Sequence, residues 1–248
     1  MMKLAFLIGF TFALANGQGI YDCPFNSLNQ CPVIKAVVNQ LERRYEDQVD
    51  ALRREAQENY GGSWGALLVT DTRLIRSSVF FNLPVFSNNG ARAYCNDVVN
   101  GIQYSLFQTL NTLAPVAKPK KALLKPKARH VATPKAAVED CPQEGVRNII
   151  IQAVNQFPGD PERQSDYVIR ECSANFGGRW GSIIATNPAI YNSQLFFYSP
   201  VGLLNGRSAY CTTEVSGYQH TVLQPGNIGL RSLAAEDDLG HFGTKKLD

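Results

Sequence analysis

The chain has 248 residues, of which 44% are hydrophobic and 18% are charged, and its formal net charge is only +3. This composition excludes a wholly disordered or fibrous protein and a uniformly basic nucleic-acid-binding protein. No run reaches the roughly 18 apolar residues that a membrane-spanning helix needs. The length suffices for one large domain or for two small domains, each with its own core.

Residues 1–17 carry the features of a secretory signal peptide. Lys3 supplies a positive start, residues 4–14 form a largely apolar run, and small residues follow at Ala15 and Gly17, where a signal peptidase would cut. A buried N-terminal helix is the alternative, but the segment has no polar face. We therefore expect a secreted, extracellular protein and exclude this segment from the fold.

The rest of the chain contains an internal repeat with an offset of 116 residues. Residues 33–108 align with residues 149–224 without a gap, and over a third of the paired positions are identical. The clearest match is the phrase Gly-Gly-x-Trp-Gly, which places Trp64 opposite Trp180. Self-similarity at a fixed spacing is typical of duplicated modules. We therefore predict two homologous copies of one domain.

Each copy has the pattern of two helices followed by strands. In the first copy, apolar residues recur at helical spacing over 33–44 and 46–59, and two glycines end the second helix. A continuous apolar run over 64–69 predicts a central strand, and a further strand is expected over 77–81. The second copy repeats this order at the same offset.

An Asn-Gly pair then predicts a tight hairpin turn in each copy, at 89–90 and at 205–206. The simplest packing of these elements is an antiparallel sheet covered by the two helices. The predicted fold class is therefore α+β, with two homologous copies that each pack two helices on an antiparallel sheet.

The repeat also predicts the domain boundaries: a first domain over 20–113, a linker over 114–140, a second domain over 141–224 and a disordered tail over 225–248. Within the linker, residues 118–135 hold seven basic residues, three prolines and no acidic residue. Proline prevents a regular helix and like charges repel, so we expect a solvated, extended spacer. Its charge would also suit an acidic partner.

The cysteines beyond the signal peptide are Cys23, Cys31, Cys95, Cys141, Cys172 and Cys211. An even number in an oxidising compartment favours disulfides. No two cysteines have the close spacing of a zinc knuckle and the three histidines are scattered, so we expect no metal site.

The repeat constrains how these cysteines pair. It predicts a bond between Cys141 and Cys211, and one between Cys95 and either of the two N-terminal cysteines. Because each copy holds three cysteines, full pairing requires at least one bond between the copies, unless a thiol is free or bonds to another chain. Cys172 aligns with an alanine of the first copy. Our hypothesis is that Cys172 and the remaining N-terminal cysteine join the two domains.

Two kinds of aromatic residue are candidate binding residues. Trp64 and Trp180 either cover the end of a sheet with their apolar surface or are exposed platforms that stack on carbohydrate. Paired phenylalanines are the second kind, because neighbours along a strand face opposite sides of the sheet. One residue of each pair then either forms an exposed apolar patch or is buried against the sister domain. The paired residues are Phe80, Phe81, Phe196 and Phe197.

No pattern in the sequence predicts catalysis or a cofactor. The shared pattern contains no histidine, and no nucleophile, phosphate-loop or metalloprotease motif is present. A glycosidase needs only two carboxylates, and three recur in both copies. However, Asp50 and Asp166 each precede an arginine by four residues, which is the spacing of an ion pair on a helix surface. The recurring carboxylates are Glu46, Asp50, Glu55, Glu162, Asp166 and Glu171.

The phrase from Arg54 to Val69, which runs through Tyr60 and Trp64, resembles the passage from helix to central strand in dynein light chains. The order of helix, helix and strands is similar too. Dynein light chains are cytosolic and dimerise to bind peptides by strand addition, whereas this chain has a signal sequence and six cysteines. The resemblance implies that two tandem copies imitate such a dimer inside one chain, with free sheet edges that accept partners.

The overall design also resembles small nematode extracellular proteins, including ground-like-domain proteins and eggshell permeability-barrier proteins, although the ground-like pattern has further cysteines. We therefore expect a secreted, non-enzymatic structural or interaction protein with two binding modules. Its expected partners are extracellular proteins or matrix polymers, in the assembly of a matrix or a barrier layer such as an eggshell. Two alternatives remain open: a secreted hydrolase that uses the repeated carboxylates, and a carrier of a small apolar ligand between helices and sheet.

Overall fold

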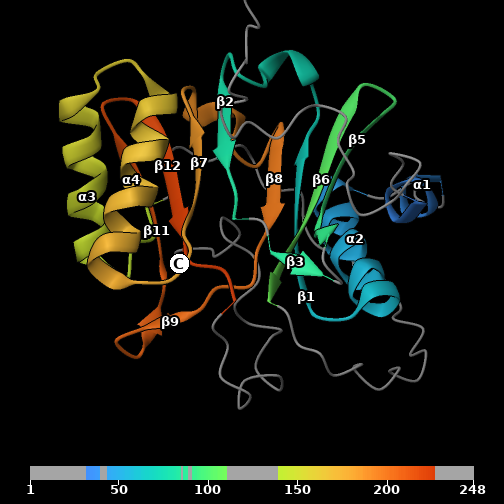
Figure 1. The fold of residues 1–248 in the computed structure, drawn as a ribbon. Coiled ribbons are helices and arrows are strands. Elements are labelled where there is room, and N and C mark those ends of the chain that lie inside the picture. Colours follow the sequence, from blue (N-terminus) through green and yellow to red (C-terminus); the bar gives the residue numbers. More distant parts are fainter. Residues whose placement is uncertain (1–31, 40–43, 85, 89–90, 111–138, 227–248) are drawn as a thin grey trace, which may run out of the picture.

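A computed structural model of the protein describes residues 32–39, 44–84, 86–88, 91–110 and 139–226 (Figure 1). We call residues 32–110 the N-terminal half and residues 139–226 the C-terminal half. Several predictions concern residues outside this description: the signal peptide, Cys23, Cys31, the turn at 89–90, the linker up to residue 138 and the tail from residue 227.

The described residues of the N-terminal half form two α-helices, a short 3-10 helix and the first group of strands. These elements are α1 (Pro32–Asn39), α2 (Tyr45–Tyr60), β1 (Ser63–Val69), η1 (Thr72–Leu74), β2 (Val79–Asn82), β3 (Ser87–Asn88), β4 (Ala91–Arg92), β5 (Tyr94–Val99) and β6 (Ile102–Leu110).

The C-terminal half has the same order of elements. They are α3 (Glu144–Gln156), α4 (Pro161–Phe176), β7 (Gly181–Ala185), η2 (Pro188–Ile190), β8 (Leu195–Tyr198), β9 (Leu203–Leu204), β10 (Arg207–Ser208), β11 (Tyr210–Val215) and β12 (Tyr218–Leu223). The predicted turn at 205–206 joins β9 to β10, and both of its residues have positive φ.

The two long helices follow from local sequence. α2 buries Val49, Leu52 and Ala56, which lie along one face of the helix. α4 begins after Asp160, whose carboxylate accepts a hydrogen bond of 3.0 Å from the backbone N–H of Arg163. Each helix ends at a glycine with a positive φ, as the Gly-Gly pairs predict.

The longer strands form two four-stranded antiparallel sheets with the orders β5-β6-β1-β8 and β11-β12-β7-β2 (Figure 1). Three strands of each sheet belong to one half, and the fourth, at an edge, comes from the other half. The α+β class with antiparallel sheets is confirmed. The expectation that each copy builds a sheet from its own strands is wrong, because β2 and β8 are exchanged between the halves.

Burial on both faces explains why β8 stays in the sheet of the N-terminal half, whereas β2 is only partly buried in the other sheet. β8 pairs with β1, which places Phe196 opposite Leu68. β2 pairs with β7, which places Phe80 opposite Ile184. Successive residues of a strand face opposite sides, so β8 directs Phe196 toward the N-terminal helices and Phe197 toward the centre of the molecule. A strand with only one buried face would bury less apolar surface and would therefore be stabilised less by its sheet.

The buried side chains form three clusters. One lies between the first sheet and α1 and α2, and another lies between the second sheet and α3 and α4. The central cluster joins residues of both sheets, including Leu67, Phe107 and Ile183. The helices therefore lie on the two outer sides of the molecule, with both sheets between them (Figure 1).

Candidate functional site

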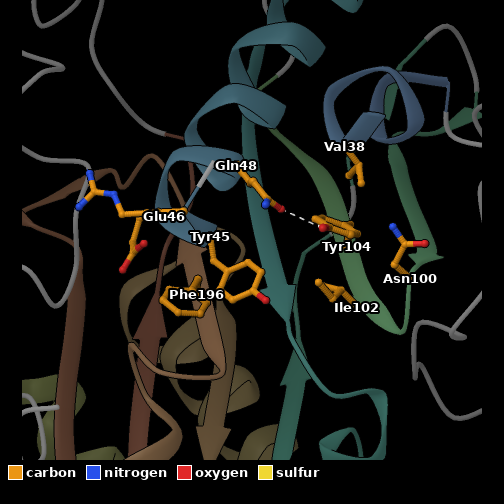
Figure 2. Close-up of a pocket in the computed structure, with 9 residues that line it drawn as sticks. Val38, Tyr45, Glu46, Gln48, Asn100, Ile102, Tyr104 and Phe196 are labelled. Atoms are coloured by element: carbon orange, nitrogen blue, oxygen red, sulfur yellow. Dashed lines mark hydrogen bonds between the residues drawn. The ribbon is translucent and has the colours of Figure 1, made fainter. Parts of the chain in front are cut away.

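A pocket of about 480 Å³ opens beside the N-terminal helices (Figure 2). Its walls come from α1, the start of α2, the turn between β5 and β6, the beginning of β6, and the exchanged strand β8. The lining residues are Val38, Arg44, Tyr45, Glu46, Gln48, Asn100, Ile102, Tyr104 and Phe196. Both halves of the chain therefore contribute to this pocket.

One wall of the pocket holds a fixed hydrogen bond. The Tyr104 hydroxyl donates to Oε1 of Gln48 at 2.8 Å, and the Tyr104 side chain is only 1% exposed (Figure 2). Burial, with a smaller contribution from nearby Tyr45, raises the pKa of Tyr104 to about 12. The phenol therefore stays neutral and acts as a donor that orients the Gln48 amide.

The opposite wall is aromatic and comes from both halves. The rings of Tyr45 and Phe196 lie 5.4 Å apart, and Tyr45 is 36% exposed at the mouth (Figure 2). A ligand site between helices and sheet is one of the alternatives that the sequence leaves open, but the sequence does not predict this lining, because Phe196 reaches the pocket only through strand exchange. The paired phenylalanines were the one signal that pointed toward it.

This combination of surfaces suits an amphipathic ligand. The volume falls in the range of small-molecule sites, and apolar side chains share the lining with the amides of Gln48 and Asn100. Arg44 and Glu46 add one charge of each sign. The lining contains no histidine, cysteine or serine.

The corresponding positions of the C-terminal half carry different chemistry. His220 occupies the place of Tyr104, and Gln164 occupies the place of Gln48, each at an offset of 116 residues. Gln164 donates from Nε2 to the Phe157 carbonyl at 2.7 Å, which leaves its buried Oε1 without a partner among the described residues. Both ring nitrogens of His220 also lack a hydrogen-bond partner there, and the residue is fully buried.

Burial lowers the pKa of His220 to about 4. The imidazole is therefore neutral at physiological pH. Because no solvent reaches the ring, a substrate in solution could not reach it either. His220 is a core histidine rather than a general base.

The two tryptophans are buried, so of the two alternatives the one with exposed carbohydrate platforms is wrong. Trp64 is 3% exposed and Trp180 is 2% exposed. Each indole N–H donates to the carbonyl of the first glycine of its phrase, Gly61 at 2.7 Å and Gly177 at 2.9 Å. The tryptophan thus fastens the end of the helix to the start of the strand, which is the structural alternative of the sequence analysis.

The phenylalanine pairs do not form a fully exposed patch. Phe196 and Phe197 are buried on opposite faces of β8, and Phe81 packs against the central cluster while it remains partly exposed. Phe80 is partly exposed as well. The alternative of burial against the other half is therefore correct for the C-terminal pair, because strand exchange inserts that pair into the N-terminal core.

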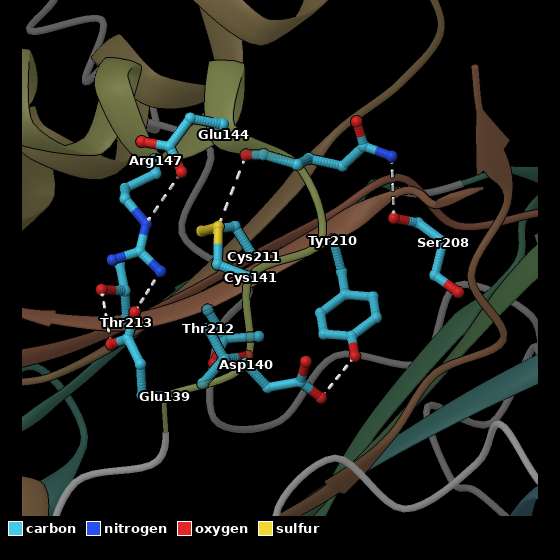
Figure 3. Close-up of a disulfide and its surroundings, with 12 residues drawn as sticks. Glu139, Asp140, Cys141, Glu144, Arg147, Ser208, Tyr210, Cys211, Thr212 and Thr213 are labelled. Atoms are coloured by element: carbon cyan, nitrogen blue, oxygen red, sulfur yellow. Dashed lines mark hydrogen bonds and ion pairs between the residues drawn. A yellow bond between two sulfur atoms is a disulfide. The ribbon is translucent and has the colours of Figure 1, made fainter. Parts of the chain in front are cut away.

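The cysteines differ in part from the prediction. Cys141 and Cys211 form a disulfide, as predicted (Figure 3). Cys95 is disulfide-bonded too, and no described residue is its partner. Cys172 is a free, fully buried thiol in the outer C-terminal cluster, so the hypothesis that it joins the two domains is wrong. It occupies an inward position of α4, where a small apolar side chain packs well.

The disulfide anchors the residues before α3 to the second sheet (Figure 3). Asp140 exchanges two backbone hydrogen bonds of 2.8 Å with Thr212 on β11. The Tyr210 hydroxyl donates to the Asp140 carboxylate, and Thr213 donates to Glu139 at 2.8 Å. This segment therefore covers the outer edge of β11.

The two recurring aspartates, Asp50 and Asp166, make contacts on the helix surfaces. Asp50 forms ion pairs with Arg53 and Arg54, at 2.9 and 2.5 Å. Asp166 instead accepts a hydrogen bond of 3.3 Å from Asn82 on the exchanged strand β2. The predicted helix ion pair is thus found for Asp50. Arg170 bonds Glu171 rather than Asp166.

The described residues contain no group of three His, Cys, Asp or Glu side chains that could hold a metal ion. None of the helices described is both long enough and apolar enough to cross a membrane. No known family model matches the sequence, and a comparison with curated proteins finds no match.

Proposed function

We propose that the chain is a secreted, non-enzymatic interaction protein, built from two homologous modules, that acts in the assembly of an extracellular matrix or barrier layer such as an eggshell. Its two modules would bind extracellular proteins or matrix polymers. The basic segment 118–135, which lies outside the described residues, would bind an acidic partner in addition. The Cys141–Cys211 disulfide is consistent with an oxidising compartment.

The correspondence of the two halves supports the duplication. Four pairs of elements begin and end at positions that differ by 116 residues at both ends: α2 and α4, η1 and η2, β2 and β8, and β5 and β11. The same offset relates the hairpins β3–β4 and β9–β10. Independent halves would not be expected to share both element order and offset.

Twin exposed surfaces on α2 and α4 carry the proposal. Arg54, Glu55 and Asn59 recur as Arg170, Glu171 and Asn175. The two asparagines even make the same contact, since each donates to the carbonyl four residues earlier at 2.8 Å. Glu55 and Glu171 are partly buried, whereas the two arginines and the two asparagines are exposed. Exposed polar residues contribute little to stability, so the fold alone does not require the identity of these four. We call these two surfaces the twin faces.

The placement of the twin faces suits a connector. α2 and α4 lie on opposite sides of the molecule (Figure 1). Strand exchange joins the sheets beneath them, so their separation is held by the core rather than by the linker. Two like faces at a set distance can bridge two partners, and the first contact raises the effective concentration for the second.

Binding to isolated matrix from the native fluid would test this function. We expect the full chain to bind and cross-link the matrix. The variants R54E and R170E should each keep binding but lose cross-linking, and the double variant should lose both. R73E, on exposed η1, is the matched control with the same charge change and should behave like the wild type. Equal cross-linking by the wild type and the double variant would refute the proposal.

The hydrolase alternative gives a different result in the same material. Glu55→Gln and Glu171→Gln together remove the recurring carboxylates of the twin faces. A binding protein should retain its partner, since the amide remains polar and isosteric. A hydrolase should lose the release of soluble matrix fragments, because a Gln cannot act as acid or nucleophile.

The pocket supports carriage of a small amphipathic ligand as a second candidate function. Titration of the full chain with 1-anilinonaphthalene-8-sulfonate should then give one saturable site. Ile102→Trp would fill the pocket and abolish that site. Tyr218→Trp, at the corresponding position of the C-terminal half, is the matched control and should leave it unchanged. Equal probe binding by both variants would refute a carrier function.

A further inference from the structure

The strongest unused feature of the molecule is the reciprocal strand exchange between its halves. We propose that the same exchange also forms between halves of different chains, so that a second copy of this protein is one of its binding partners. This inference deepens the proposed function, because it names a partner for assembly. Its structural basis is independent of the twin faces.

The exchange is held by complete strand pairing. β8 of the C-terminal half extends the sheet of the N-terminal half, and β2 extends the other sheet in return. A backbone hydrogen bond of 2.9 Å prolongs each pairing, from Thr70 to Gln194 in one sheet and from Thr186 to Ser78 in the other. Each half therefore carries both a strand to give and an edge that accepts one.

Side chains of the exchanged strands contribute specific contacts. Tyr198 on β8 lies under the Arg53 guanidinium, whose carbon is 4.1 Å from the ring centroid. Phe196 packs against Tyr45 on the same side of the sheet. On the other strand, Asn82 donates to Asp166 on α4. Each of these contacts joins one residue of each half. An N-terminal half and a C-terminal half can therefore make them whether or not the two halves belong to the same chain.

The disulfides of the described residues do not restrict the exchange to one chain. Among the described residues, no disulfide joins the two halves, because Cys141 and Cys211 lie in the same half and Cys172 is free. The halves are connected through residues 111–138, which lie outside the described residues. An N-terminal half therefore meets identical contacts in its own C-terminal half and in that of another copy.

Mass action then decides which form is populated. Two halves that belong to one chain meet at an effective concentration on the order of 1 mM, so a dilute chain closes on itself. At comparable protein concentrations, as in a deposited matrix, exchange between chains competes. Two chains that trade halves give a closed dimer, and continued trading gives longer assemblies with the same local structure.

Refolding of the full chain tests this directly. The chain is unfolded with its disulfides intact and refolded at concentrations from about 1 µM to about 1 mM. Light scattering coupled to size-exclusion chromatography then reports the mass. We expect monomer at the lowest concentration and a growing fraction of dimer and larger species toward the highest. Monomer alone at every concentration would overturn the proposal.

A matched pair of glycine variants identifies the interface. A side chain at Gly65 on β1 would overlap the Phe107 ring, and a Cβ at Gly181, the corresponding position on β7, would lie 2.8 Å from Pro84 Cδ. G65V therefore disturbs packing inside the N-terminal half, whereas G181V disturbs the contact of β7 with the residues that follow β2 in the other half. Each substitution lies in one half only and leaves the sequence of the other half unchanged. Refolded together, the two full-length variants retain one sound half of each kind, which can pair only between chains.

We expect the mixture to form a heterodimer that shows the wild-type thermal transition with reduced amplitude, and neither variant alone to show that transition. A mixture that behaves as the sum of its components would overturn the proposal. So would wild-type oligomers that form equally well from either variant alone, because they would not require exchange. Matrix binding by the monomer is measured separately, so failure here leaves the proposed function standing, and the reverse also holds.

Discussion

The two halves of the molecule share a backbone plan but differ in what they bury at matched positions. Tyr104 in the N-terminal half is satisfied by Gln48, whereas His220 and the Gln164 Oε1 in the C-terminal half have no hydrogen-bond partner among the described residues. The halves also differ in packing, since Phe196 is buried and its counterpart Phe80 is partly exposed. One fold therefore supports a pocket with oriented polar groups in one half and, within the described residues, a core with an unpartnered histidine in the other.

Among the changes that test this difference between the halves, removal of the Cys141–Cys211 disulfide should lower the free energy of unfolding most. The bond spans 70 residues, and the chain-entropy model gives a loss of about 4 kcal/mol for such a loop. Urea unfolding of the C141A/C211A variant should show this loss. Cys172→Ala, which restores the residue of the other half and breaks no disulfide, is the control and should cost far less. Similar losses for both variants would mean that the bond does not anchor the C-terminal half.

The paired phenylalanines should differ in the same assay. Phe196→Ala removes a ring buried in the N-terminal core and should cost about 3 to 4 kcal/mol. Phe80→Ala, at the matched and partly exposed position, should cost about half as much. Only the first substitution should also abolish probe binding to the pocket. Equal costs would contradict the difference in burial.

Acid should weaken the protein through His220. Its pKa is near 6.5 in the unfolded chain and about 4 in the folded chain, so between these values the unfolded state binds the additional proton. The free energy of unfolding therefore falls as the pH drops from about 6.5 toward 4, by about 2 kcal/mol at pH 5. His220→Tyr removes this contribution. The loss of unfolding free energy between pH 7 and pH 5 is measured for the wild type and for the variant. The carboxylates contribute to both losses, so the difference between the two losses reports His220 alone. Equal losses would contradict a lowered pKa of His220 in the folded chain.

The smallest change in stability should come from substitutions that place the residue of one half at the matched position of the other half. At pH 7, H220Y places a phenol where the unpartnered Gln164 Oε1 can accept its hydrogen bond, as Gln48 does for Tyr104. We expect a gain of about 1 kcal/mol. Tyr104→Phe should lose a similar amount, because it removes that donor from Gln48. H220F keeps the apolar ring without the hydroxyl, so a gain as large as that of H220Y would exclude the hydrogen bond as its cause.

Much of the local structure could be predicted because its causes lie within short segments. The apolar stripe of α2, the glycines that end both long helices and the Asn-Gly turn at 205–206 all act over a few residues. The pairing of Cys141 with Cys211 followed from the repeat. The pocket could not be predicted in this way, because Tyr45 and Phe196 are brought together from distant parts of the chain.

The amino-acid sequence by itself determined the α+β class, the succession of helices and strands and the repeated pattern, since periodicity, helix ends and turn residues are local properties. Only the tertiary structure decided which half completes each sheet. A strand such as β8 can pair with any free edge of suitable register, and that choice depends on burial of both its faces by residues far away in the chain. The same long-range packing buried Trp64 and Trp180 and left Cys172 unpaired.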